Sequence, residues 1–162
     1  MKVRGNLKYL FAMMDDETRF WIAQEVADTK HNYDARRLFS KARDTIGRRP
    51  KTLITDGLPS YREAYLKEFY THKLETRTEH IHSIRIQGDR EIRDREKVMR
   101  GLKKPDTPII SGYQIYHNYV RPHEALEGKT PADACGIEVQ GENKWLTLIQ
   151  NASRGKQPTP RT

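Results

Sequence analysis

One acidic residue ends a short apolar run near the middle of the chain. Residues 52–55 read Thr-Leu-Ile-Thr and are followed by Asp56 and Gly57, after which the sequence is helix-like. A buried strand that ends in this way places a carboxylate at the carboxyl end of a sheet, where open α/β folds have their sites. The alternative is that Asp56 caps the next helix, and on this stretch alone the frequency of aspartate at N-caps favours the cap.

Two other groups of residues could do chemistry. His80 and His82 alternate within residues 80–86 and fall on one face of a predicted strand, and a His-x-His pair can bind zinc. No further Cys or His cluster with ligand-like spacing lies nearby, so a structural role is favoured. Asp15 and Asp16 separate two apolar runs, and the residue types favour a turn over a pair of metal ligands.

Residues 89–104 carry seven basic and four acidic side chains. Their spacing allows charge pairs at i,i+3 and i,i+4, which predicts a helix. Two interpretations stay open, a solvated charged helix and a helix that contacts nucleic-acid phosphates. For the second interpretation the candidate DNA-binding residues are Arg93, Arg95, Lys97, Arg100, Lys103 and Lys104.

Composition narrows the possible partners. The 162 residues include 30 basic and 22 acidic ones, a net charge of +8, which indicates a polyanionic partner and above all nucleic acid. The single cysteine, Cys135, excludes an internal disulfide and a thiolate-rich metal site. No apolar run approaches the roughly 20 residues of a membrane span and no signal peptide is visible, so we expect a cytoplasmic protein without a membrane partner.

The hydrophobic pattern alternates between strand and helix periods, which predicts a mixed α/β fold. The predicted strands are residues 7–14 and 19–26, joined as a hairpin, then 52–55 and 80–86. The predicted helices are one from Asn32 or Asp34 to Gly47, one after Pro59, one over 109–120, one beginning at Thr130-Pro131 and a short one over 142–149. Residues 151–162 are expected to be a disordered basic tail.

Three segments together resemble a known family. The first is Tyr116-x-Asn118-x-x-Arg121-Pro122-His123-x-x-Leu126-x-Gly128-x-Thr130-Pro131-Ala132. The second is Thr55-Asp56-Gly57-x-x-x-Tyr61, and the third is Arg93-x-Arg95-Glu96-Lys97-Val98-Met99-Arg100-Gly101. This pattern resembles the DDE-type insertion-sequence transposases, the prokaryotic relatives of retroviral integrases.

The resemblance implies an RNase H-like fold, a mixed sheet flanked by helices, over residues 1–137, followed by a short helix and the basic tail at 138–162. It also implies cutting and rejoining of DNA at insertion-sequence ends with Mg²⁺ or Mn²⁺. Two divalent ions serve such a reaction, and three carboxylates must converge from different elements to hold them. Asp56 matches the second of these carboxylates.

The chain departs from the family pattern at the other two carboxylates. The first aspartate would lie upstream of Met1, so the first strand is expected to be missing, which leaves an open sheet edge. The glutamate segment looks as though about ten residues, roughly three helical turns, had been deleted. Glu91 has a suitable spacing from Asp56, but by local motif it matches a residue downstream of the family's glutamate, so it is at best a replacement.

Two functions follow as expectations. One is a transposase catalytic domain, truncated at its N-terminus and internally deleted, and therefore inactive on its own. The alternative is a non-catalytic nucleic-acid-binding remnant or regulator, acting with itself or with a full-length transposase.

Overall fold

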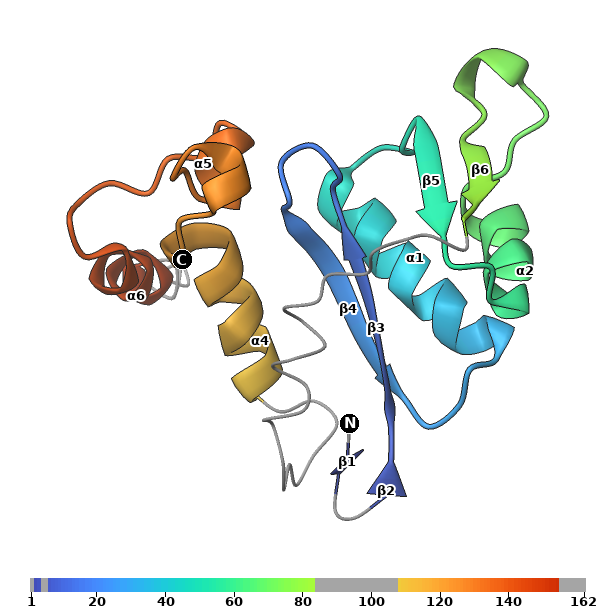
Figure 1. Ribbon diagram of the computed structural model, residues 1–162, viewed down its shortest axis with the longest axis horizontal. Coiled ribbons are helices and arrows are strands. Elements are labelled where there is room, and N and C mark those ends of the chain that lie inside the picture. The colour runs from blue at the N-terminus through green and yellow to red at the C-terminus, as the bar shows by residue number, and fades with distance from the viewer. Residues whose placement is uncertain (1, 4–5, 84–107, 155–162) are drawn as a thin grey trace, which may run out of the picture. The chain divides into compact units, whose positions relative to one another are not determined.

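The computed structural model describes residues 2–3, 6–83 and 108–154. The chain forms two compact units (Figure 1). The α/β unit comprises residues 1–14 and 22–107, and the helical unit comprises residues 15–21 and 108–162. No helix in the described part of the chain is both long and apolar enough to cross a lipid bilayer.

Residues 2–3 form a short strand that was not predicted, and the predicted strand over residues 7–14 is interrupted at Lys8; otherwise the strands of the structure follow the predicted order. They are β1 (Lys2–Val3), β2 (Asn6–Leu7), β3 (Tyr9–Met14), β4 (Trp21–Ala27), β5 (Thr52–Thr55) and β6 (Glu79–His82). Strand β1 pairs with β2 in antiparallel orientation, β3 pairs with β4 across the predicted hairpin, and β5 pairs with β6 in parallel. The parallel register places Leu53 opposite His80 and Thr55 opposite His82. The mixed α/β prediction is confirmed.

Helix α1 (Asn32–Ile46) begins earlier than either predicted cap would allow, by one residue for Asn32 and by three for Asp34. Its N-cap is His31, and Asp34 supports this start from inside the first turn. The Asp34 carboxylate accepts hydrogen bonds from the His31 N–H at 3.2 Å and from the Thr29 hydroxyl at 2.5 Å. The helix ends as predicted at Gly47, whose φ of 70° is a left-handed conformation that glycine adopts readily.

Helices α1 and α2 (Pro59–Glu68) pack extensively against each other and cover the strands. The short 3₁₀ turn η1 (Leu74–Thr76) precedes β6. A single hydrophobic core joins the two helices to both pairs of strands. Its buried members are Phe11, Ala23, Ala27, Ala35, Leu38, Phe39, Ala42, Leu53, Ala64, Tyr65 and Phe69.

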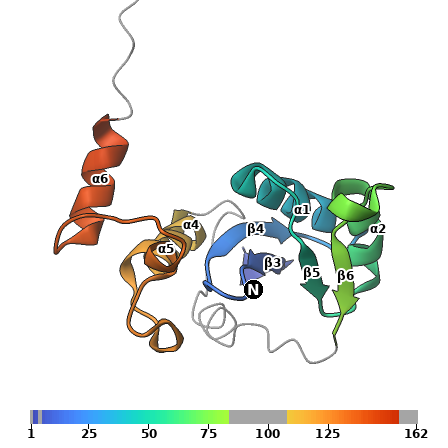
Figure 2. The ribbon, with the colours of Figure 1, turned by 90° about the horizontal axis from the view of Figure 1, so that it is seen from above.

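The sheet of the α/β unit is divided in its middle. Figures 1 and 2 show the strands in the order β4, β3, β5, β6. Within the described residues, however, hydrogen bonds pair β3 only with β4 and β5 only with β6. Phe11 of β3 and Leu53 of β5 nevertheless belong to the same core. The two halves therefore share one set of covering helices but lack a continuous hydrogen-bonded ladder.

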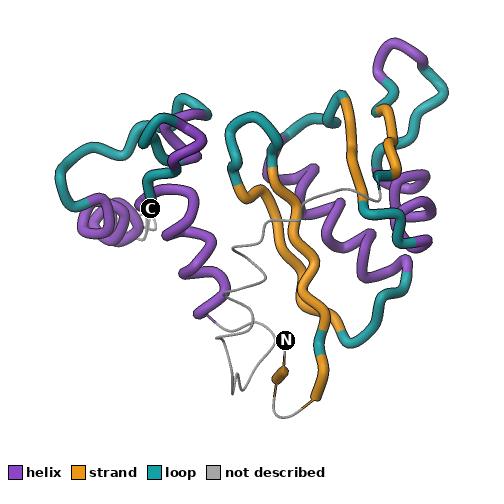
Figure 3. Tube along the Cα trace, in the orientation of Figure 1, coloured by secondary structure: helices purple, strands orange, loops and turns teal. Residues whose placement is uncertain are grey.

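The helical unit contains α4 (Pro108–Ile115), the π-helical turn η2 (Tyr116–Val120), η3 (Glu124–Leu126), α5 (Pro131–Ala134) and α6 (Lys144–Arg154). Figure 3 shows that residues 108–154 are helix or loop throughout. The Thr130 cap is confirmed, because its hydroxyl accepts the Asp133 N–H at 3.2 Å. The last helix runs past its predicted end to Arg154, since Trp145, Ile149 and Ala152 continue the helical period, so residues 151–154 are not a disordered tail.

Candidate active site

Asp56 lies where β5 ends. Leu53 and Thr55 are buried and Ile54 is exposed, so the strand alternates up to its last residue, and the chain then turns outward. The Asp56 side chain is exposed to solvent, and its Oδ1 accepts the N–H of Leu58 at 3.2 Å. Gly57 has a φ of +83°, a left-handed conformation in which a side chain would be strained. This turn holds the carboxylate at the carboxyl end of the strand.

The N-cap interpretation of Asp56 is wrong. The N-cap of α2 is Leu58, and Pro59 occupies the first helical position. Proline suits that position because its missing N–H would have no partner there and its φ is already helical. The bond from Leu58 to Asp56 is instead an Asx turn, in which an aspartate oxygen accepts the N–H two residues later.

Tyr61 connects the Asp56 turn to the core. Its ring stacks on Phe39 of α1 with centroids 5.7 Å apart and meets Phe11 of β3 edge-on at 6.1 Å. Burial raises the pKa of the Tyr61 hydroxyl strongly, and the negative charge of Asp56 raises it further. Tyr61 therefore stays neutral and anchors the first turn of α2. In the sequence, both residues belong to the segment Thr55-Asp56-Gly57-x-x-x-Tyr61, but nothing in its spacing indicated this link.

The two histidines of β6 lie on one face as predicted, with ring centroids 4.2 Å apart. The His80 Nε2 is 3.0 Å from the Thr55 Oγ1, and its ring lies over Tyr65 of α2 at 4.7 Å. Burial, followed by the charge of His82, lowers the pKa of His80. A neutral His80 hydrogen-bonded to Thr55 is a structural group that braces the last residue of β5.

The remaining predicted site residues divide into two groups. Glu91 and the basic residues Arg93, Arg95, Lys97, Arg100, Lys103 and Lys104 lie outside the described residues. Asp15, for which the sequence favoured a turn over a metal-ligand role, lies in a turn. Its Oδ2 accepts the N–H of Thr18 at 2.8 Å and the Thr18 hydroxyl at 2.7 Å.

The described residues do not fit a two-metal centre. Such a centre needs several carboxylates around a pair of ions. Across residues 2–3, 6–83 and 108–154 there is no group of three or more His, Cys, Asp or Glu side chains that could hold a metal ion. Asp56 is an exposed carboxylate outside any such group.

The C-terminal motif has a clear structural role inside the helical unit. The Asn118 Oδ1 accepts the N–H of Trp21 at 2.8 Å, and its Nδ2 donates to the Trp21 carbonyl at 2.9 Å. The Gln114 Nε2 donates to the same carbonyl at 2.8 Å. The His117 Nε2 lies 2.9 Å from the Arg19 carbonyl oxygen. The two amides bind the backbone of Trp21 much as a neighbouring strand would, and the His117 ring binds the carbonyl of Arg19.

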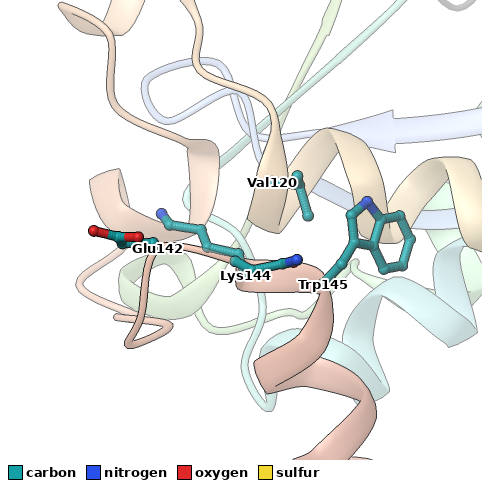
Figure 4. A pocket seen from close by; sticks show the side chains of 5 residues that line it. Val120, Glu142, Lys144 and Trp145 are labelled. Atoms are coloured by element: carbon teal, nitrogen blue, oxygen red, sulfur yellow. The ribbon is translucent and has the colours of Figure 1, made fainter.

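A hollow at the start of α6 lies within the helical unit (Figure 4). It is lined by Val120, Glu142, Asn143, Lys144 and Trp145, none of which is a predicted site residue. The Lys144 ammonium is paired with Asp133 at 2.8 Å. Burial acts to raise the pKa of Asp133, but hydrogen bonds from Lys144 and Thr130 outweigh it and lower the pKa overall. This pairing fastens α6 to α5.

Comparison with known protein families identifies the chain. The profile of the DDE domain of IS240-type transposases matches residues 1–123, which is most of the chain. The chain therefore belongs to the transposase DDE-domain family, as the sequence predicted. No curated protein and no solved structure matches it.

Proposed function

We propose that this chain is a DNA transposition protein in which Asp56 supplies one of the three carboxylates of a two-metal cleavage and strand-transfer centre. The observation that carries the proposal is the position of Asp56. In a chain of the DDE family, an exposed aspartate is held at the carboxyl end of a parallel strand by a backbone N–H and a left-handed glycine. That is where open α/β sheets have their sites.

We further propose that the α/β unit is an incomplete RNase H-like sheet, within a catalytic domain over residues 1–137. The order of elements supports this: a hairpin, then α1, then a parallel pair of strands connected through α2. The unpaired neighbours β3 and β5 leave a break in the ladder where one more strand is expected. In the family pattern, the strand that carries the first aspartate would occupy this position.

The proposal includes the inference that the isolated chain does not transfer DNA strands. A lone exposed aspartate provides one hard oxygen ligand, and Mg²⁺ or Mn²⁺ held for phosphoryl transfer requires several. DNA at insertion-sequence ends remains the proposed partner, because the excess of 30 basic over 22 acidic residues favours a polyanion.

A second candidate function is a non-catalytic DNA-binding regulator that acts with another copy or with a full-length transposase. The observation that favours it is the lack of an acidic cluster around Asp56 within the described ranges, together with the basic net charge. Under this function Asp56 has no role in the protein's activity.

The test is a Mn²⁺-dependent nicking and strand-transfer assay on the element's end DNA, with Asp56→Asn as the matched variant. We expect both proteins to bind DNA in a salt-dependent manner. We expect neither protein to cleave it. Cleavage that disappears in Asp56→Asn would show a complete centre and contradict the inferred inactivity. Mn²⁺ binding, followed by electron paramagnetic resonance, separates the two functions: loss of binding in Asp56→Asn supports the ligand role, and unchanged binding favours the regulator.

A further inference from the structure

Two loops of the α/β unit meet at the end of β5 and β6 opposite to Asp56. Residues 47–51 lead into β5, and residues 71–79 lead through η1 to the first residue of β6. Because the two strands are parallel, both loops lie at their amino ends (Figure 1). We name this pair of loops the basic loop pair.

Hydrogen bonds fix the two loops to each other. The Thr78 hydroxyl donates to the Pro50 carbonyl at 2.7 Å, and the Glu79 N–H donates to the Lys51 carbonyl at 2.8 Å. Within the second loop, the Arg77 Nε donates to the Thr71 carbonyl at 2.8 Å. The loops therefore present their side chains from a braced backbone, which limits the conformational entropy lost when a ligand binds.

The cations of the loops differ from those of α1. On α1, Arg36 and Arg43 pair with Glu68, while Arg37 and Lys41 pair with Glu25. The loop cations Arg48, Arg49, Lys51 and Lys73 are exposed and form no ion pair with any described residue. Two exposed acids, Glu75 and Glu79, lie on the second loop, so the excess positive charge is concentrated on residues 48–51.

We propose that the basic loop pair binds the phosphodiester backbone of duplex DNA, as a second contact at the opposite end of the strands from Asp56. This inference rests on the proposed function, which makes DNA the partner. Exposed arginine and lysine side chains contact phosphates irrespective of sequence and release counterions when they do so. The contact holds DNA against the domain without reading bases.

The experiment measures duplex DNA binding by fluorescence anisotropy between about 50 and 300 mM salt. The test variant is Arg48→Gln/Arg49→Gln/Lys51→Gln in the full chain. We expect the magnitude of the negative slope of log K against log salt to fall by about two to three, roughly 0.9 for each phosphate contact removed. The matched control removes three other exposed cations, Arg62→Gln/Lys67→Gln/Lys129→Gln, and is expected to retain the slope. Circular dichroism checks that both variants are folded.

The outcomes are separable. A wild-type protein that does not bind DNA would overturn the proposed function together with this contact. Wild-type binding with an unchanged slope in the loop variant would overturn the contact alone. An equal decrease of the slope's magnitude in the control variant would also overturn the contact. The decrease would then depend on the total charge of the protein and not on the basic loop pair. The charge-conserving variant Arg48→Lys/Arg49→Lys is expected to keep the wild-type slope, and loss of the slope there would contradict a purely electrostatic contact.

Discussion

Acidic residues are used in opposite ways at two regions of the α/β unit. Between α1 and the strands, Glu25 is buried and pairs with Arg37 at 2.9 Å and Lys41 at 2.5 Å. At the carboxyl end of β5, Asp56 is exposed and accepts one backbone N–H. Glu25 is therefore part of the fold. Asp56, in contrast, contributes little to the stability of the fold, and its carboxylate is accessible to a ligand.

The largest expected effect is at the buried acid. Glu25→Gln removes the charge that compensates two cations and should lower the free energy of unfolding by about 3 kcal/mol. Urea denaturation followed by circular dichroism measures it. Lys41→Met, which leaves the Arg37 pair in place, serves as a milder control. A loss below about 0.5 kcal/mol for Glu25→Gln would remove the contrast with Asp56.

The next largest loss of stability is expected at Asn118 and Gln114 of the C-terminal motif, whose side chains bind the backbone of Trp21. Asn118→Ala removes the side-chain acceptor of the buried Trp21 N–H and one donor to its carbonyl, and should destabilise the protein by about 2 kcal/mol. Gln114→Ala should cost about 1 kcal/mol, since Asn118 still donates to the same Trp21 carbonyl. The free energies of unfolding of the two variants are measured by thermal or urea unfolding. Equal decreases would mean that Asn118 does not hold Trp21 through two hydrogen bonds.

A smaller effect is the pH dependence due to His80. Its pKa is lowered from 6.5 in the folded chain, so the unfolded chain binds more protons below that pH. Stability should therefore be complete above about pH 6.5 and decline as the pH falls toward the lower folded pKa. Because the neighbouring His82 charge contributes to the shift, His82→Gln should reduce this dependence. Urea midpoints measured across pH 5–8 with about half-unit steps test the sign.

The smallest expected change is at Asp56 itself. Asp56→Asn keeps an acceptor oxygen for the Leu58 N–H and should alter the free energy of unfolding by less than about 0.5 kcal/mol. Denaturation in parallel with Glu25→Gln gives the comparison directly. A loss as large as that of Glu25→Gln would show that Asp56 is a structural acid.

Local patterns in the sequence predicted much of this fold. Strand β5 has the predicted bounds, and Gly47 and Thr130 end and begin helices as expected, because these features depend on neighbouring residues. The cap at His31 was missed, since Asp34 acts from within the helix. The family motif in the sequence singled out Asp56, and the structure places this residue at the end of β5.

Features that depend on distant residues could not be predicted in the same way. Asn118 binds the backbone of a residue 97 positions earlier, and nothing in the spacing of the motif reveals that partner. The break between β3 and β5 depends on which strands pair, and hydrophobic alternation within each strand does not determine pairing. The lack of an acidic cluster around Asp56 within the described residues is likewise a property of the folded chain.

Mn²⁺ binding by the wild-type chain and by Asp56→Asn tests the central claim most directly, because it does not require catalysis. Electron paramagnetic resonance counts the ions bound to each protein. Asp56 as a single available ligand predicts weak binding of one ion, which the Asp56→Asn variant loses while remaining folded. Tight binding of two ions would contradict the incomplete centre, and binding that is identical in the two proteins would contradict the role of Asp56.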